Sequence, residues 1–340
     1  MIKIQDNTIR DGMQQRNVNK NFNTKLKILD LLKSVNIDSL EVGMCSTIED
    51  FNLLSEISNH LSITQKMVVL TRLVHNDIVL ACKLVRVNKN LVIKLLFPIS
   101  DLHITKKLHS TKRNMLEKLK QSLNYICNLN INVSVCLEDA TRADEKYLIK
   151  VLEICKNYTI NFITISDTVG CSTPEEYGRL IRKICNYKYP FEISVHCHND
   201  LGLATANTIA GVLNGATQVE TTFLGIGERA GNCAIDEILY LLTKKYNIKT
   251  DLDLKRIFEI SKELEDLLNY KSSPLKPIIG ENAFVHESGI HHSPISGLSS
   301  SKIISSRLQE CYNALTTDDI YEIDTFYKTI SKITNNIIII

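Results

Sequence analysis

The sequence predicts an α/β fold in which eight parallel strands, each followed by a helix, close into a (β/α)8 (TIM) barrel. Eight short apolar or β-branched segments recur along residues 1–248, and several are continuous apolar runs, as in parallel strands buried on both faces. Amphipathic helical segments separate them, and about 250 residues is the typical size of this barrel. A doubly wound open sheet is the alternative, but no G-x-G-x-x-G motif follows the first strand.

The predicted elements alternate along this part of the chain. Strands are predicted over residues 2–5, 39–42, 67–70, 92–97, 132–136, 162–166, 192–196 and 218–222. Helices are predicted over residues 24–35, 144–158, 173–187, 203–214 and 234–246, and a further helix begins after Thr47. Thr173 and Pro174 mark a distinct helix start, because Thr is a favoured N-cap and Pro suits the first helical position.

A change of pattern near residue 250 divides the chain. The barrel is predicted to occupy residues 1–248, and residues 249–340 are predicted to form a short, mostly helical extension that includes a lid. One amphipathic helix is predicted over residues 252–270. Residues 271–280 contain Pro274, Pro277 and Gly280, which is typical of a linker.

Composition indicates a cytoplasmic enzyme that acts on small molecules. The net charge of +2 is too small to indicate a nucleic-acid or anionic-membrane partner. No run of about 18 apolar residues is present to span a membrane. Ten cysteines are scattered without a C-x-x-C pair, and the first residues form a strand pattern instead of a secretory signal, so free thiols in a reducing compartment are expected.

Reactive side chains of such a barrel lie at the carboxyl ends of its strands. After the first strand, Asp11 can bind a cation and Arg10 can stabilise a developing oxyanion, although an ion-paired surface turn is the alternative. At the end of the seventh strand, His196 and His198 are two residues apart and therefore point to the same side. Both imidazoles can bind one metal ion, and the alternative is a chance pair bonded to the backbone.

Other loops carry further polar candidates. In the glycine-rich loop 225–232, Asn232 could supply an oxygen to a metal or bind substrate. Glu138 could act as a base, and Thr168 could donate to a substrate carboxylate. A tight turn or helix capping is the alternative for each. Residues 286–292 hold three histidines, and a lid that supplies a catalytic His is weighed there against an adventitious cluster.

These motifs, in this order, resemble those of the alpha-isopropylmalate synthase/homocitrate synthase family of the DRE-TIM metallolyases. The matching segments are residues 6–14, 41–43, 138–142, 167–170, 196–203, 225–232 and 286–291. The most specific feature is the combination of His-Cys-His-Asn-Asp with Gly-Ile-Gly-Glu-Arg-Ala-Gly-Asn. The resemblance implies a Claisen-type condensation of acetyl-CoA with a 2-oxo acid, followed by thioester hydrolysis.

The resemblance also implies a divalent metal ion, with acetyl-CoA as the co-substrate. Asp11, His196 and His198 would bind the metal, with Asn232 nearby. One carboxylate and two imidazoles with open positions suit Zn, Mn or Mg. A homodimer is expected.

Roles for the remaining residues follow from the same resemblance. Arg10 would stabilise the alkoxide that forms, and Glu138 and His291 match positions tied to proton transfer at the acetyl methyl group. Thr168 would hold the substrate carboxylate. The other expected substrate-binding residues are Gln14, Glu41, His103 and Arg142. The expected oxo acid is 2-oxoglutarate, as in homocitrate synthases; citramalate, isopropylmalate and specialised-metabolite synthases remain alternatives.

The chain departs from the family pattern in two places. Met13 precedes Gln14 where the family commonly has Glu. Residues 293–340 match the family tail poorly, and Tyr321 is a weak candidate for its tyrosine. No regulatory domain of the leucine-pathway type is expected, so feedback inhibition by leucine through such a domain is not expected either.

Two other functions compete with this hypothesis. One is a carbon–carbon lyase of the hydroxymethylglutaryl-CoA lyase type, which would be expected to carry a catalytic Cys in a glycine-rich loop. The other is a barrel that binds a metal without catalysis, against which the presence of Arg10, Asp11, His196, His198 and His291 argues.

Overall fold

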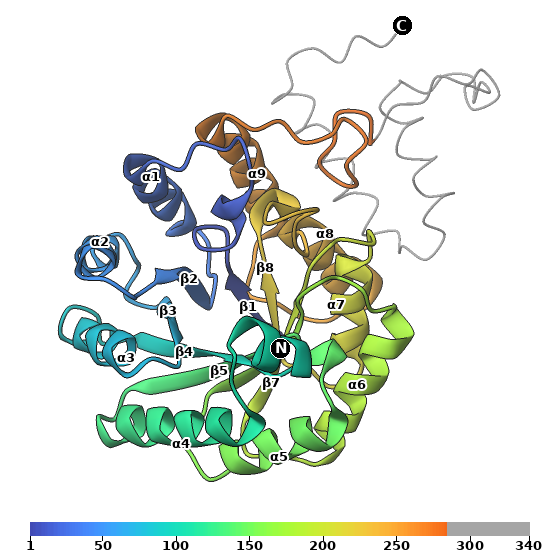
Figure 1. The fold of residues 1–340 in the computed structure, drawn as a ribbon. Coiled ribbons are helices and arrows are strands. Elements are labelled where there is room, and N and C mark those ends of the chain that lie inside the picture. Colours follow the sequence, from blue (N-terminus) through green and yellow to red (C-terminus); the bar gives the residue numbers. More distant parts are fainter. Residues whose placement is uncertain (284–340) are drawn as a thin grey trace, which may run out of the picture.

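The computed structural model describes residues 1–283 and shows a closed barrel of eight parallel strands in chain order. The first strand pairs with the second and with the eighth, which closes the barrel. Figure 1 shows the helices arranged around the strands. The strands are β1 (Lys3–Asp6), β2 (Ser39–Met44), β3 (Lys66–Arg72), β4 (Leu91–Pro98), β5 (Asn132–Glu138), β6 (Phe162–Asp167), β7 (Glu192–Cys197) and β8 (Gln218–Thr221). The predicted (β/α)8 fold is therefore confirmed.

A helix follows every strand. These helices are α1 (Phe22–Leu32), α2 (Ile48–Ser58), α3 (His75–Cys82), α4 (Lys112–Asn128), α5 (Glu145–Cys155), α6 (Pro174–Asn186), α7 (Ala204–Leu213) and α8 (Ile235–Tyr240). The sequence analysis assigned no range to α3 and α4. Thr47 and Thr173 each form a capping box, with Asp50 and Glu176 respectively, which satisfies backbone N–H groups at the helix start.

The interior of this barrel is polar. On β4, Ile93, Leu95 and Phe97 are fully buried, whereas Lys94 between them points the other way and bonds to carboxylates on β2 and β8. Barrel interiors of this type are usually filled by branched aliphatic side chains. Here one layer of the interior consists of polar side chains that are hydrogen-bonded to one another. They include Gln5, Glu41, Lys94, Thr164, Ser194 and Glu220.

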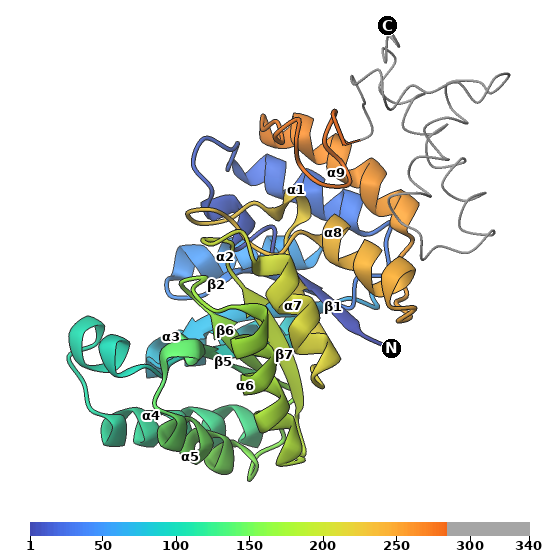
Figure 2. The same ribbon diagram turned by 90° about the vertical axis from the view of Figure 1, so that its right-hand side faces the viewer.

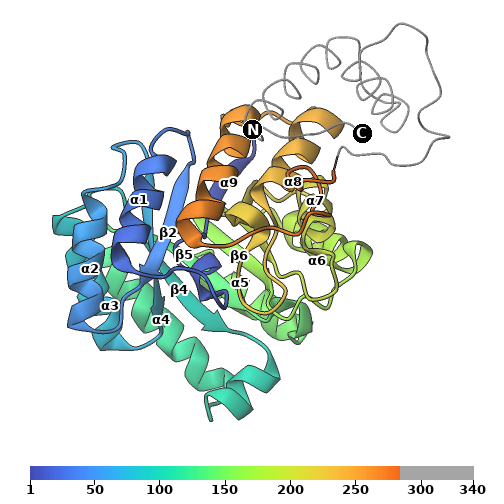
Figure 3. The ribbon, with the colours of Figure 1, turned by 90° about the horizontal axis from the view of Figure 1, so that it is seen from above.

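The predicted extension begins with a helix that packs on the barrel. Helix α9 (Leu254–Leu268) contacts α1 and α8, and Figures 2 and 3 show it in orange beside these two helices. Ile257, Ile260 and Leu264 on α9 are fully buried. The division of the chain at residue 248 stays a prediction, and His291 and Tyr321 lie outside the described residues.

Within residues 1–283, no helix combines the length and the apolar character that a membrane span requires.

Truncation of a buried α9 side chain tests whether this helix belongs to the barrel core. Leu264→Ala removes a fully buried side chain and should lower the free energy of unfolding by about 2–5 kcal/mol, measured by urea denaturation of the metal-free protein. Leu275→Ala, at a side chain that is 78% exposed, is the control and should change it by less than about 0.5 kcal/mol. Equal effects of the two substitutions would show that α9 contributes nothing to the core.

Candidate metal centre

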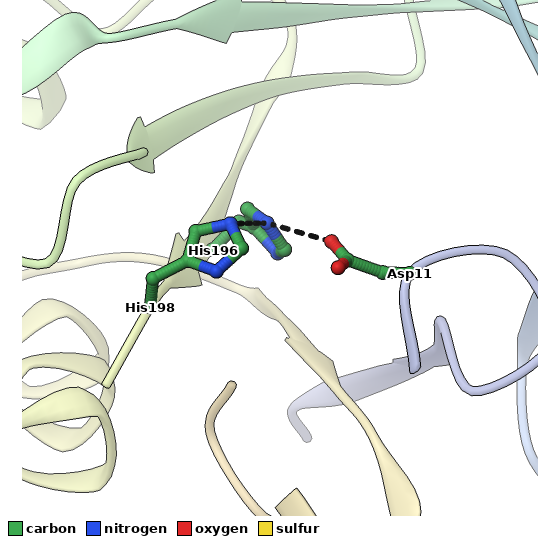
Figure 4. A group of neighbouring side chains, drawn as sticks. All are labelled: Asp11, His196 and His198. Carbon is green, nitrogen blue, oxygen red and sulfur yellow. Dashed lines mark hydrogen bonds and ion pairs between the residues drawn. The ribbon is translucent and has the colours of Figure 1, made fainter. Parts of the chain in front are cut away.

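Three side chains from the two ends of the barrel sequence converge at one point. Asp11 lies in the turn after β1, and His196 and His198 lie at the end of β7. One ligand atom of each lies within 4.8 Å of the others. The Nε2 atoms of the two histidines are 3.2 Å apart, and Nε2 of His196 is 3.4 Å from Oδ2 of Asp11. Figure 4 shows the three side chains pointing toward one another.

The chemical state of these groups fits a cation. Burial alone would raise the pKa of Asp11, but the Arg10 guanidinium and the imidazoles hold this pKa well below its usual range. Burial, and after it the neighbouring His196, lowers the pKa of His198 to about 3. A deprotonated carboxylate and a neutral imidazole are the forms that bind metal ions. Oδ1 of Asp11 is also buried without a hydrogen-bond partner among the described residues, so it remains free to coordinate.

Asn232, in the glycine-rich loop after β8, lies beside His198 of this cluster. An antiparallel bridge pairs its backbone with His198. Its Nδ2 donates to the carbonyl of Ile226 at 3.1 Å, which leaves Oδ1 buried and without a partner among the described residues. A carbonyl oxygen of this kind is a suitable additional ligand for a hard divalent cation.

The glycine-rich loop 225–232 allows Asn232 to come close to Asp11. A Cβ atom at Gly227 would lie 2.1 Å from Nδ2 of Asn232 and 3.4 Å from Oδ1 of Asp11. Only a residue without a side chain fits there. Gly231 has a φ of +96°, and a Cβ atom at this position would lie 2.1 Å from the carbonyl of Gly225. The loop that the sequence singled out is therefore shaped to bring Asn232 beside Asp11.

Two buried carboxylates support the centre from inside the barrel. Glu41 accepts a short hydrogen bond from Nε of Arg10, whose Nη1 lies 3.2 Å from Oδ2 of Asp11. Glu220 places Oε2 3.5 Å from Nδ1 of His196. A carboxylate beside the far nitrogen of a metal-binding imidazole is the arrangement that orients such ligands.

Lys94 and Glu220 were not among the predicted site residues. Lys94 lies in the middle of the apolar run predicted as the fourth strand, and a charge at such a position is a signal of a buried ion pair. Glu220 lies within the eighth predicted strand and carried no comparable signal. The partner of Lys94 could not be read from the chain, because Glu220 follows it by 126 residues.

A second group of predicted residues gathers at the ends of β4, β5 and β6. Nδ1 of His103 lies 3.4 Å from Oε1 of Glu138, and Lys107 donates to the same oxygen at 2.6 Å. Oε2 of Glu138 is buried and has no hydrogen-bond partner among the described residues. Arg142 is held by Asp139 through two bonds of 2.8 Å each, so its guanidinium is already paired.

Two predicted substrate-binding residues differ in their surroundings. The hydroxyl oxygen of Thr168 accepts a hydrogen bond of 2.8 Å from the backbone N–H of Asp139, which links it to this second group. Gln14 ends a short helical turn, Gly12–Gln14, and is exposed. The structure thus brings Arg10, Asp11, Glu41, His196, His198 and Asn232 together, gathers His103, Glu138, Arg142 and Thr168 beside one another, and leaves Gln14 at the surface.

Sequence comparison agrees with this arrangement. A family model described as HMGL-like matches residues 1–264. A 2-isopropylmalate synthase of Ruminiclostridium cellulolyticum is 40% identical over 297 residues, which is 85% of this chain and 58% of that protein. A 2-isopropylmalate synthase of Dictyoglomus turgidum is 36% identical over 88% of this chain and 61% of its own length. The chain therefore spans about three fifths of the length of the curated relatives it matches.

Comparison of structures gives the same fold. A hydroxymethylglutaryl-CoA lyase from Pseudomonas aeruginosa superposes with a TM-score of 0.69 over 80% of this chain and 94% of that chain. The sequence identity is 18%, so this likeness concerns the barrel alone.

Removal of one imidazole tests the metal centre. His198→Ala should lower the affinity for Zn²⁺ or Mn²⁺ by more than about 100-fold, because loss of outer-shell partners alone costs about 10–100-fold. Isothermal titration of the metal-free protein measures this affinity. His75→Ala, at an exposed histidine on α3, is the control and should leave the affinity unchanged. Wild-type affinity in His198→Ala would exclude His198 as a ligand.

Proposed function

This chain belongs to the HMGL-like family, and we propose that it condenses acetyl-CoA with a 2-oxo acid and releases free CoA. The observation that supports this function most directly is the convergence of Asp11, His196 and His198 next to the Arg10 guanidinium. The identity to 2-isopropylmalate synthases favours the same reaction.

The proposed reaction has two steps. A base removes a proton from the acetyl methyl group, and the resulting carbon attacks the carbonyl carbon of the 2-oxo acid. The carbonyl oxygen becomes an alkoxide and then takes up a proton to give a hydroxyl group. Water next cleaves the thioester, which gives a carboxylate and the CoA thiol.

The residues present fit a divalent metal ion of the Zn, Mn or Mg type. Asp11, His196 and His198 would hold it, with Oδ1 of Asn232 as a further ligand. When bound, such a metal supplies Lewis acidity toward the carbonyl of the oxo acid.

Arg10 would stabilise the negative charge that develops on the attacked oxygen. Burial alone would lower the pKa of Arg10, but Glu41 and Asp11 outweigh this effect and raise the pKa, so the guanidinium stays charged. Glu41 fixes its direction. A fixed cation aimed at a developing oxyanion is among the largest contributions to catalysis of this kind.

Glu138 would take part in proton transfer at the acetyl methyl group. Lys107 holds one of its carboxylate oxygens, and the other is buried and unpaired among the described residues. That second oxygen can accept a proton. His291, the other proposed participant, lies outside the described residues.

The oxo acid would be bound by the remaining predicted residues. Thr168 would bind its carboxylate. The residues proposed to line its pocket are Gln14, Glu41, His103 and Arg142.

The oxo acid is proposed only as a class. The resemblance to the homocitrate synthase branch of the family led to 2-oxoglutarate as the expected substrate, whereas the relatives compared above are named for isopropylmalate. The lyase alternative is not favoured, because residues 225–232 contain no cysteine and the relatives are synthases. A homodimer and a cytoplasmic location also remain proposals.

Release of the CoA thiol tests the function. The metal-loaded protein should release thiol from acetyl-CoA with at least one of pyruvate, 2-oxoisovalerate and 2-oxoglutarate, measured with a thiol reagent. Removal of the metal by a chelator should abolish the release, and so should His196→Ala. Absence of release with every oxo acid would contradict the synthase function, and release of acetoacetate from hydroxymethylglutaryl-CoA would support the lyase instead.

Arg10 provides a second test of the same function. Arg10→Met should lower kcat by about 100- to 1000-fold, because one fixed donor to the developing oxyanion is lost. Zn²⁺ should still bind, with an affinity lowered by no more than about 10–100-fold, because Arg10 contacts Asp11 as an outer-shell partner and is not itself a ligand. An unchanged kcat would assign Arg10 to structure alone.

A further inference from the structure

A single lysine connects the two carboxylates that support the site. Lys94 lies on β4, and its side chain is 2% exposed. Its Nζ atom lies 2.8 Å from Oε2 of Glu41 on β2 and 2.7 Å from Oε2 of Glu220 on β8. The lysine therefore spans the barrel interior and is bonded on both sides.

Each of these carboxylates reaches a different functional group. Glu41 uses its other oxygen, Oε1, to accept from Nε of Arg10. Glu220 faces Nδ1 of His196 at 3.5 Å. One continuous series of contacts thus runs from Arg10 through Glu41, Lys94 and Glu220 to His196.

Further hydrogen bonds from uncharged donors reach the same carboxylates. Gln5 donates to Glu41 at 3.0 Å. Glu220 accepts from Asn7 at 3.0 Å, and also from hydroxyl groups on β6 and β7. These donors carry no charge, so Lys94 is the cation that contacts both carboxylates.

The charges of this layer also balance around the lysine. Arg10 and Lys94 are the two cations of the series of contacts, and Glu41, Glu220 and Asp11 are its three anions. One negative charge is left over, and it suits a bound metal cation. Without Lys94, Arg10 would be the one cation left beside these three carboxylates, and it contacts only Glu41 and Asp11.

We propose that Lys94 is a positioning residue of the metal centre, which holds Glu220 against His196 and Glu41 against Arg10. This inference rests on the proposed function. Through these contacts Lys94 sets the orientation of one imidazole ligand and of the guanidinium that faces the substrate. Loss of its charge would let Glu220 turn away from His196 and draw Arg10 from its place.

A purely structural ion pair is the alternative. In that case Lys94 would stabilise the fold, and its replacement would lower the melting temperature without changing the site of the folded protein. Metal affinity of the folded, metal-free protein separates the two roles, because stability of the barrel alone does not change it.

The first variant is Lys94→Met, which keeps an unbranched side chain, one atom shorter, and removes its charge. Titration of the metal-free protein with Zn²⁺ should show an affinity lower by about 10–100-fold, the range known for outer-shell partners of metal ligands. In the thiol-release assay kcat should fall, while KM for acetyl-CoA stays near that of the wild type. Lys94→Arg should recover most of the lost affinity, because it restores a charge that can contact both carboxylates.

A second variant covers the case in which Lys94→Met fails to fold. Lys94→Met combined with Glu220→Gln removes one cation and one anion, and neutral replacement of a buried ion pair is often tolerated. This double variant should regain thermal stability, yet its Zn²⁺ affinity should stay lowered, because a neutral amide at position 220 is a weaker acceptor than a carboxylate for an N–H at Nδ1 of His196. Wild-type affinity in the double variant would overturn the proposal.

The chain offers a matched control. Lys276 is also largely buried, with a side chain 12% exposed, and it lies 2.7 Å from Oε1 of Glu237 and 3.5 Å from Oδ2 of Asp236. Lys276→Met should lower the melting temperature and leave Zn²⁺ affinity unchanged.

These measurements distinguish the proposed role of Lys94 from the proposed metal centre itself. Wild-type affinity and kcat in a folded Lys94→Met would overturn the role of Lys94 alone. A wild-type protein that binds neither Zn²⁺ nor Mn²⁺ would overturn the metal centre and, with it, the role of Lys94.

Discussion

The charged contact between Lys94, Glu41 and Glu220 inside the barrel is the interaction on which the candidate site depends. Charges buried in a protein interior are tolerated when they are paired and their remaining hydrogen-bonding positions are satisfied. Here the pairing also determines where Arg10 and His196 lie, since each is a partner of one of these carboxylates. The polar layer inside the barrel and the site beside it are therefore one connected unit.

The mouth of the barrel has two sides with different character. On one side, one ligand atom each of Asp11, His196 and His198 lies within 4.8 Å of the others, as a cation would require. Around Glu138 and Arg142, most charges are already paired with neighbours, and one carboxylate oxygen has no partner in this part of the chain. The first side is suited to hold an ion, and the second to exchange a proton with a bound substrate.

Much of this arrangement could be predicted from the sequence. Apolar runs predicted the strands because a parallel strand is buried on both faces, and the spacing of His196 and His198 predicted a shared face. The helices α3 and α4 received no predicted range. The pairing of Lys94 with Glu220, and of Arg142 with Asp139, could not be foreseen, because spacing along the chain does not determine which charges meet across a barrel.

The bridge between His198 and Asn232 has a consequence for assembly of the protein. Asp11 follows the first strand, the histidines end the seventh, and Asn232 follows the eighth. During synthesis, the first of these proposed ligands appears with the first strand and the last only after the eighth. Capture of a metal ion by all four proposed ligands would therefore report that the barrel has closed, and a nascent chain lacking its eighth strand would have only an incomplete set of them.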